Sequence, residues 1–298
     1  MHRLLCSIYD TFSPPADAAP GLRTRLPATA GKQHALLVAA ISIAMTLCSA
    51  GSHPLGAQAP ADPGNNSQAK PTSKPVAKQQ WIALKDHWKQ CEFGGDGEVK
   101  IKDGVVKLDF GQPITGVRWL GSFEGDKAVG SDSNDPKLLD AIKAAKKAPK
   151  LARDHYEIRW ECRRNGGDDF LCAMTMPIGK NYISLVMGGW GGGITGISSI
   201  DGYDASDNET TTYKAYDNGT WYKARVRVDA AKITVWIDEI EMFDVPREGH
   251  TFDIRFEMEP CAPLGIANFE CDSSIRNIQW RALTQAEKRA AARQQSEQ

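Results

Sequence analysis

The segment HYEIRWEC, residues 155–162, alternates strictly between apolar and polar side chains from Tyr156 onward. A period of two is typical of a half-buried β-strand, with one face in a core and the other in water. The predicted inner face consists of Tyr156, Ile158, Trp160 and Cys162, and the predicted outer face of Glu157, Arg159 and Glu161. This segment therefore indicates a sheet that covers a core on one side only.

Many other segments repeat this pattern between turn residues. The clearest is EVKIKDGVVKLDF, residues 98–110, in which Asp103-Gly104 favours a tight hairpin. Asp238-Glu239 likewise stands between two strand-like segments and is predicted to be a turn rather than an acidic site. With about a dozen such segments, the chain is predicted to be all-β, an antiparallel sandwich or barrel.

The first 50 residues are predicted to contain a signal peptide. Basic residues precede an uncharged run, Ala35–Leu47, that is short for a membrane span, and the small residues that follow offer a cleavage site. We therefore expect a secreted or periplasmic protein with no transmembrane span in the mature chain. A lipid anchor at Cys48 is a weaker alternative because bulky Leu47 precedes it, and an uncleaved anchor is another.

Three further regions are predicted after the leader. Residues 51–80 are rich in Pro, Ser, Gln and Lys and are predicted to form a disordered linker. Residues 81–283 are predicted to form the sandwich domain, and residues 284–298 are predicted to form a polar helical tail. The tail begins with a capping-box pattern from Thr284. One inserted surface helix is predicted at 135–148, where an Asp-Pro pair starts an apolar stripe.

The charge balance excludes one class of partner. The whole chain has a formal net charge of -1, and residues 81–298 contain 29 Lys and Arg against 34 Asp and Glu. A nucleic-acid-binding protein needs a basic surface to neutralise phosphates, so we expect no nucleic-acid partner.

Five cysteines remain after the leader. Cys162 and Cys172 are four and five residues from Gly166-Gly167 on either side, so they could face each other if that pair turns a hairpin. Cys261 and Cys271 form a second candidate disulfide pair. Buried free thiols on apolar strand faces are the alternative.

A glycine-rich segment, GGWGGGITGISSIDGYDASDNETTTY, occupies residues 188–213. Its G-x-G-x-x-G pattern does not indicate a dinucleotide site, because no helix-forming run follows the glycines. Glycines on a curved sheet leave a floor of backbone, over which Trp190 could stack on a sugar ring. The predicted substrate-binding residues are therefore Trp190, Gly189, Gly191 and Gly192. A loop held by its own Asp and Ser side chains is the alternative.

Acidic residues supply the candidate catalytic groups. They are Asp201, Asp204, Glu209 and Asp168. Asp168 and its neighbour Asp169 could also bind Ca²⁺, completed by Asp201 and Asp204, although turn chemistry is the safer interpretation of the pair. No cofactor is firmly indicated, and the three histidines after residue 80 are too scattered for a His-rich metal centre.

The sequence also resembles a known family. Residues 170–245 and PLGIANFECDSSIRNIQWRAL, residues 263–283, are similar to secreted bacterial 3-keto-disaccharide hydrolase domains. The glycine-rich segment is similar to that of a planctomycete-type branch. The resemblance implies a concanavalin-like or laminin-G-like jelly roll, and cleavage of a glycosidic bond in a sugar oxidised at C3. It implies no established catalytic set, and the insertion at 126–152 is longer than in common members.

Two functions follow as expectations. The first is a glycoside hydrolase or lyase that acts on 3-keto-glycosides, with an oligosaccharide or glycoside as its partner. The second is a non-catalytic carbohydrate-binding or adhesion module, because the same fold serves both.

Overall fold

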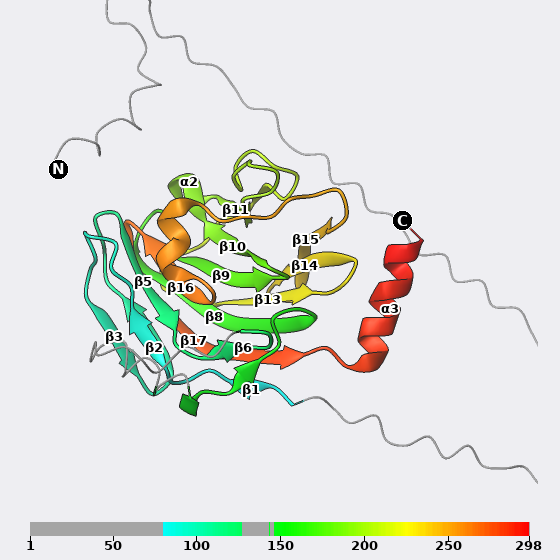
Figure 1. Ribbon diagram of the computed structural model, residues 1–298. Helices are drawn as coiled ribbons and strands as arrows, with labels where there is room; N and C mark the ends of the chain where they lie inside the picture. Colours follow the sequence, from blue (N-terminus) through cyan, green and yellow to red (C-terminus); the bar gives the residue numbers. More distant parts are fainter. Residues whose placement is uncertain (1–79, 127–142, 144–145, 298) are drawn as a thin grey trace, which may run out of the picture. The chain divides into compact units, whose positions relative to one another are not determined.

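The computed structural model describes residues 80–126, 143 and 146–297 (Figure 1). These residues belong to one compact unit, Pro71–Gln298. The predicted leader, nearly all of the predicted linker and most of the predicted helix at 135–148 lie outside the described residues. Among the helices that are described, none is long and apolar enough to cross a membrane.

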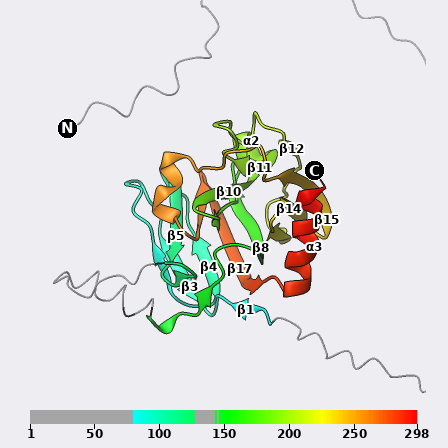
Figure 2. The ribbon, with the colours of Figure 1, turned by 45° about the vertical axis from the view of Figure 1, so that its right-hand side comes forward.

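The described residues form two antiparallel sheets stacked as a sandwich, as predicted (Figures 1 and 2). The larger, eight-stranded sheet has the order β15-β14-β13-β8-β17-β4-β3, and β1 also pairs with β17. Its strands are β1 (Ile82–Ala83), β3 (Val99–Lys102), β4 (Val105–Leu108), β8 (Tyr156–Gly167), β13 (Tyr222–Val228), β14 (Lys232–Ile237), β15 (Ile240–Pro246) and β17 (Cys271–Ala282).

The second sheet has seven strands in the order β12-β11-β10-β9-β16-β5-β2. Its strands are β2 (Trp88–Gln90), β5 (Ile114–Trp119), β9 (Cys172–Ile178), β10 (Asn181–Gly188), β11 (Ile194–Ser198), β12 (Thr212–Tyr213) and β16 (Gly265–Phe269). A short parallel pair, β6 (Ser122–Phe123) and β7 (Lys150–Leu151), completes the described strands.

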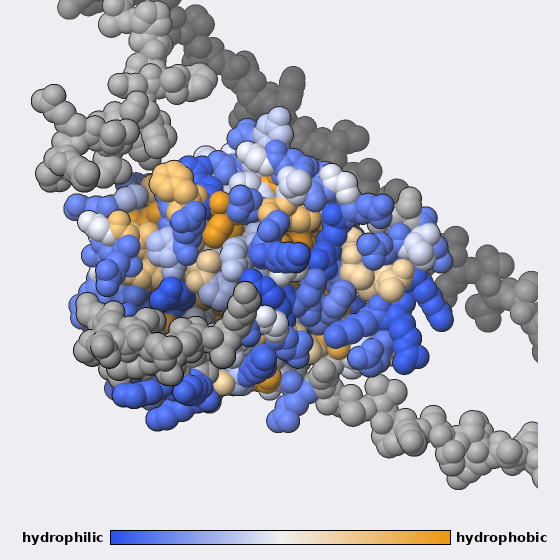
Figure 3. Space-filling view, in the orientation of Figure 1, coloured by the Kyte–Doolittle hydropathy of each residue, from blue (hydrophilic) through white to orange (hydrophobic). Residues whose placement is uncertain are grey.

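The core lies between the two sheets and is rich in aromatic residues. Tyr156 stacks on Trp280 with ring centroids 3.8 Å apart, and Phe123 meets Trp280 edge to face. The inner face predicted for residues 155–162 is confirmed, since its side chains from Tyr156 to Cys162 are almost fully buried. Figure 3 shows hydrophilic side chains over much of the face in view, with apolar ones in smaller groups between them.

Two predicted turns and the predicted tail are confirmed. Asp103-Gly104 joins β3 to β4, and Asp238-Glu239 joins β14 to β15, all four residues with positive φ. The tail forms helix α3 (Gln285–Ser296), which Thr284 caps in a complete capping box. Two short helical segments occur in loops, α2 (Gly189–Gly192) and a 3₁₀ helix, η1 (Phe256–Cys261).

The hairpin predicted around Gly166-Gly167 is wrong. Strand β8 pairs with β13 on one side and β17 on the other, so no edge remains for β9, which crosses to the other sheet. Long-range pairing has therefore overridden a local turn signal. Cys162 and Cys172 still come together, but from opposite sheets, and both are free thiols.

The other three cysteines of the described residues, Cys91, Cys261 and Cys271, are also buried free thiols. The sulfur of Cys261 lies 3.9 Å from the sulfur of Cys91, so the structure associates it with Cys91 rather than with its predicted partner, Cys271. The Sγ of Cys271 donates to the carbonyl of Phe170, and burial raises the pKa of Cys271 to about 12. The structure thus corresponds to the free-thiol alternative.

Candidate functional site

The glycines beside Trp190 allow a tight turn between β10 and β11. Gly191 and Gly192 have positive φ, as does Trp190, and the Asp169 carboxylate accepts a hydrogen bond from the Gly191 amide at 3.0 Å. A side chain on Gly192 would collide with the backbone of Asp168. Strand β11 follows this turn directly, so no long helix presents its N-terminus to a phosphate. The indole of Trp190 is 45% exposed and available to a ligand.

The floor of small residues on the seven-stranded sheet is covered by the chain itself. A Cβ on Gly196 would lie 3.0 Å from Ala205, and one on Gly265 would lie 2.6 Å from the Cβ of Cys261. Ala205 and Cys261 also belong to a second apolar cluster, which packs on the outer side of this sheet. At these two positions, neither of which was among the predicted substrate-binding residues, the absence of a side chain makes room for a loop.

Three of the four predicted acids lie apart from the predicted stacking platform, and only Asp168 is close to the turn that carries Trp190. Trp190 precedes β11 and Asp201 follows it, and a five-residue strand separates its ends by roughly 13 Å. Asp204 forms an ion pair with Arg255 and accepts a hydrogen bond from Ser198 at 3.0 Å. The structure therefore does not combine Trp190 with Asp201, Asp204 and Glu209 into one groove.

Two of the predicted acids do meet, on either side of one histidine. His250 Nδ1 lies 2.7 Å from Asp201 Oδ2, and His250 Nε2 lies 3.2 Å from Glu209 Oε1. Hydrogen bonds from the backbone and hydroxyl of Thr251 and from His250 lower the pKa of Asp201 to about 2. This Asp–His–Glu relay is exposed, and sequence analysis missed His250 because it is 41 residues from Glu209 in the chain.

The acids proposed to hold Ca²⁺ do not converge. Asp169 binds the amides of Phe170 and Gly191, whereas Asp201 and Asp204 bind separate partners. Within the described residues, no group of three or more His, Cys, Asp and Glu side chains has a geometry suited to a metal ion. The four predicted ligands therefore do not fit one calcium ion.

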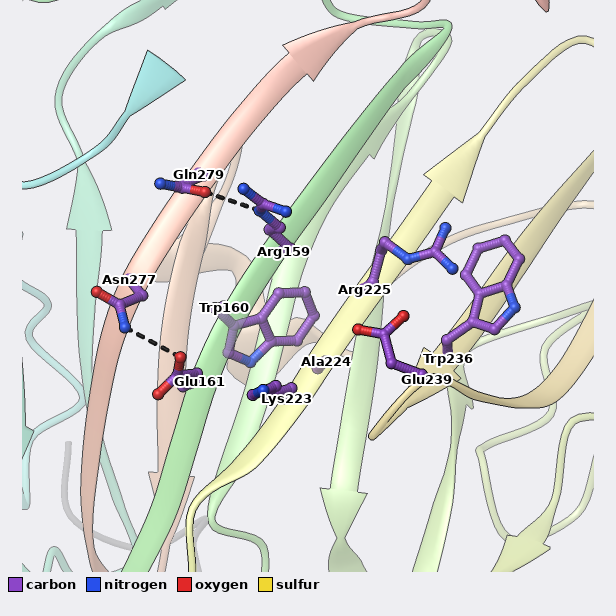
Figure 4. A pocket seen from close by; sticks show the side chains of 10 residues that line it. All are labelled: Arg159, Trp160, Glu161, Lys223, Ala224, Arg225, Trp236, Glu239, Asn277 and Gln279. Atoms are coloured by element: carbon purple, nitrogen blue, oxygen red, sulfur yellow. Dashed lines mark hydrogen bonds between the residues drawn. The ribbon is translucent and has the colours of Figure 1, made fainter. Parts of the chain in front are cut away.

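A pocket lies instead on the outer face of the eight-stranded sheet, over β17, β8, β13 and β14 (Figure 4). Its volume is about 370 Å³. Most of its lining is polar or charged, and Figure 4 shows these side chains side by side on neighbouring strands. The lining residues are Arg159, Trp160, Glu161, Lys223, Ala224, Arg225, Trp236, Glu239, Asn277 and Gln279.

The two carboxylates of this pocket have different surroundings. Burial opposes ionisation of Glu161, but hydrogen bonds from Asn277 at 3.0 Å and Arg276 at 2.8 Å outweigh it and lower the pKa of Glu161. Glu239 lies in the exposed β14–β15 turn, and none of the described residues forms a hydrogen bond or ion pair with its carboxylate. Hydrogen-bond donors thus hold the carboxylate of Glu161, whereas none of the described residues holds that of Glu239.

Sequence analysis did not select this pocket. Arg159 and Glu161 were recognised only as the polar face of residues 155–162, and Glu239 only as a turn residue. The usable signal was the row of charged side chains on the outer face of several strands. Their meeting depends on strand register, which a single sequence does not reveal.

The fold and the polar pocket define a β-sandwich domain with a site suited to a polyhydroxylated ligand, because carboxylates, amides and cations can all bond to hydroxyl groups. The sequence profile of the 3-keto-alpha-glucoside-1,2-lyase-like domain matches residues 79–281. The chain belongs to this family of carbohydrate-active domains, which confirms the family resemblance found in the sequence.

Solved structures similar to this chain include carbohydrate-related proteins. Domain 4 of AbnA, a GH43 extracellular arabinanase from Geobacillus stearothermophilus solved with arabinotriose, has 16% identity and a TM-score of 0.37, covering 66% of this chain and 82% of that chain. The carbohydrate-binding module CBM66 from Bacillus subtilis has 8% identity and a TM-score of 0.35, covering 66% and 96%. A glycosyl hydrolase family protein from Mycobacterium fortuitum has 12% identity and a TM-score of 0.32, covering 61% and 78%. No curated protein matches the sequence.

Proposed function

We propose that this domain cleaves glycosides of 3-keto sugars in the pocket on the eight-stranded sheet. The observation that carries the proposal is the presence of a free carboxylate, Glu239, in the same pocket as the ammonium group of Lys223. The family supplies the type of substrate, and the pocket supplies the two kinds of group that its cleavage requires.

The reaction is an elimination. A ketone at C3 acidifies the proton on C2, and the Glu239 carboxylate takes this proton. The electron pair of the broken C2–H bond passes through an enolate, whose oxygen Lys223 stabilises, and then forms the C1=C2 double bond. The bond between C1 and the glycosidic oxygen breaks, and that oxygen leaves with its electron pair and takes up a proton. Water adds to C1=C2 in a later step, which completes a net hydrolysis.

The relay of Asp201, His250 and Glu209 is a second candidate for the same chemistry. Its specific support is that His250 contacts both predicted acids, so that Asp201 can orient the ring while Glu209 faces solvent. In that case Trp190 would bind a more distant part of the substrate. A non-catalytic carbohydrate-binding role is the remaining alternative.

Turnover of a chromogenic 3-keto-glucoside by the purified full chain tests these proposals together. The parent should release the chromophore, and Glu239→Gln should lower kcat at least about 100-fold, as expected for loss of a general base. Glu270→Gln is the matched control, because Glu270 is also an exposed turn glutamate with positive φ.

The other outcomes separate the alternatives. Loss of turnover in Glu209→Gln with full activity in Glu239→Gln would move the reaction to the relay. No turnover by the parent, together with saturable binding of oligosaccharides, would overturn the enzyme proposal in favour of a binding module.

We also propose that the mature protein is secreted or periplasmic, as its leader suggests. Expression of the full chain in a bacterial host followed by N-terminal sequencing of the extracellular or periplasmic product tests this. A product that begins shortly after residue 50 is expected, and an unprocessed cytoplasmic product would contradict it.

A further inference from the structure

The outer face of the eight-stranded sheet carries three rows of side chains in register across β13, β8 and β17. In two of the rows a glutamate stands on β8 between two cations. The third row has an arginine at that central position and a neutral glutamine on β17. The rows are Arg227–Glu157–Arg281, Lys223–Glu161–Arg276 and Arg225–Arg159–Gln279. We call the third row the arginine row.

The arginine row places two positive charges directly opposite each other. Like charges directly opposite each other in a cross-strand pair destabilise a sheet. Arg159 donates to Gln279 at 2.7 Å, and no carboxylate among the described residues pairs with it. Arg225 reaches only Glu157, at 3.7 Å, and that carboxylate already binds Arg281 at 2.6 Å. The row therefore has an excess of positive charge.

Indole rings hold both guanidinium groups. The guanidinium carbon of Arg225 lies 3.7 Å from the ring centroid of Trp236, and that of Arg159 lies 4.1 Å from the ring of Trp81. Such stacking stabilises a cation and orients its plane, while the N–H donors at the edge remain free for a ligand. The two arginines are thus positioned as donors, although they repel each other.

Both arginines line the pocket of the proposed reaction, together with Lys223 (Figure 4). A guanidinium fork matches the two oxygens of a carboxylate or the oxygens of a sulfate ester. We propose that the sugar bound in this pocket carries an anionic group, the carboxylate of a hexuronic acid, and that Arg159 and Arg225 bind it. This inference rests on the proposed function for the location of the sugar, but it concerns selectivity rather than cleavage.

Binding of two disaccharides to the full chain tests the inference by calorimetry. Cellobiouronic acid and cellobiose differ only in that a carboxylate replaces a hydroxymethyl group. We expect the acid to bind at least about 10-fold more tightly at low salt, since hydrogen bonds between charged groups are stronger than those between neutral groups. The preference should shrink at 0.5 M salt, because screening weakens exposed charge pairs.

Variants locate this preference. Arg159→Gln and Arg225→Gln should each remove most of it, which brings the ratio of the two affinities close to one. Arg163→Gln should retain it, because Arg163 stacks on Trp221 outside the pocket. Thermal melts of all three variants distinguish loss of the site from loss of the fold. Arg159→Lys serves the same purpose as a milder substitution, because it keeps the charge.

Three results would overturn the inference. The first is equal affinity for the acid and the neutral sugar, and the second is retention of the preference in both Arg159→Gln and Arg225→Gln. The third is tighter binding of cellobiose 6′-sulfate than of the uronate. That result would show that the pocket selects a sulfate ester rather than a carboxylate. Neither disaccharide is a keto sugar, so this result is independent of turnover. The preference can hold where cleavage fails, and cleavage can occur without the preference.

Discussion

The two outer faces of the sandwich differ in what covers them. On the seven-stranded sheet, β9 is buried at all seven positions, because loops of the same chain pack over its outer side. On the eight-stranded sheet, β13 alternates between buried and more exposed positions, and its outer side chains line an open pocket. One face is therefore a second interior, and the other is a surface on which a ligand can bind.

This difference between the faces also explains what the glycines of the covered sheet do. Gly196 and Gly265 lie on the covered face, where they let loops approach the sheet, so an abundance of glycine marks close packing there. The open face is marked by large charged and aromatic side chains. In this molecule the proposed binding surface is indicated by a set of charges repeated along the strands.

The largest expected effect tests whether the covered face is closely packed. In Gly265→Ala the new methyl group would lie 2.6 Å from the Cβ of Cys261 and against its backbone, which cannot move away easily. We expect a loss of about 3 kcal/mol in the free energy of unfolding, as overpacking of an interior can produce. Urea unfolding of the full chain measures it.

Gly193→Ala is the control for this substitution. Gly193 also lies at the end of a strand, but a Cβ there meets nothing within 4 Å and its φ is -109°. Its stability should change by less than about 0.5 kcal/mol. If both variants are equally stable, the loops do not pack on the seven-stranded sheet as closely as described, and the contrast between the faces fails.

Much of the fold could be predicted from the sequence, because its signals are local. Alternation along residues 155–162 identified the inner face of β8, and Asp103-Gly104 and Asp238-Glu239 identified two turns. The wrong prediction, a hairpin at Gly166-Gly167, arose where a local glycine signal competed with strand pairings to residues far away in the chain.

The site was less predictable for the same reason. The arginine row exists only because β8, β13 and β17 pair in one register, and Arg159 and Gln279 are 120 residues apart. The relay through His250 likewise joins two distant loops. The types of residue were visible in the sequence, but their meeting was not.

A smaller effect tests the role of charge at the edge of the open face. The hydrogen bond from Arg281, opposed by partial burial and supported by Thr284, lowers the pKa of Glu287 from 4.5 to about 2. Because the folded-state pKa is the lower one, this stabilisation is present above pH 4.5 and is lost as the pH falls toward 2. After allowance for solvent screening of this partly exposed group, Glu287→Gln should cost about 2 kcal/mol at pH 7, and more than half of that difference should disappear at pH 3.

Urea unfolding of parent and variant at both pH values measures this change. Gly265→Ala provides a comparison, since its cost comes from steric contact and should be the same at pH 7 and pH 3. If the loss of stability in Glu287→Gln does not vary with pH, Glu287 acts through packing rather than through charge. The two faces would then be stabilised in the same way.

The smallest expected effect concerns Trp190, which belongs to neither face. Its indole is 45% exposed on a turn whose shape depends on neighbouring glycines and on Asp169, so Trp190→Ala should change stability by less than about 0.5 kcal/mol. Because the proposed pocket lies on the opposite sheet, cellobiouronic acid should bind this variant as it binds the parent. If Trp190→Ala instead lowers the affinity substantially without changing the stability, the ligand binds at the glycine-rich turn. A residue that touches the sugar would lower its affinity in this way without affecting the fold.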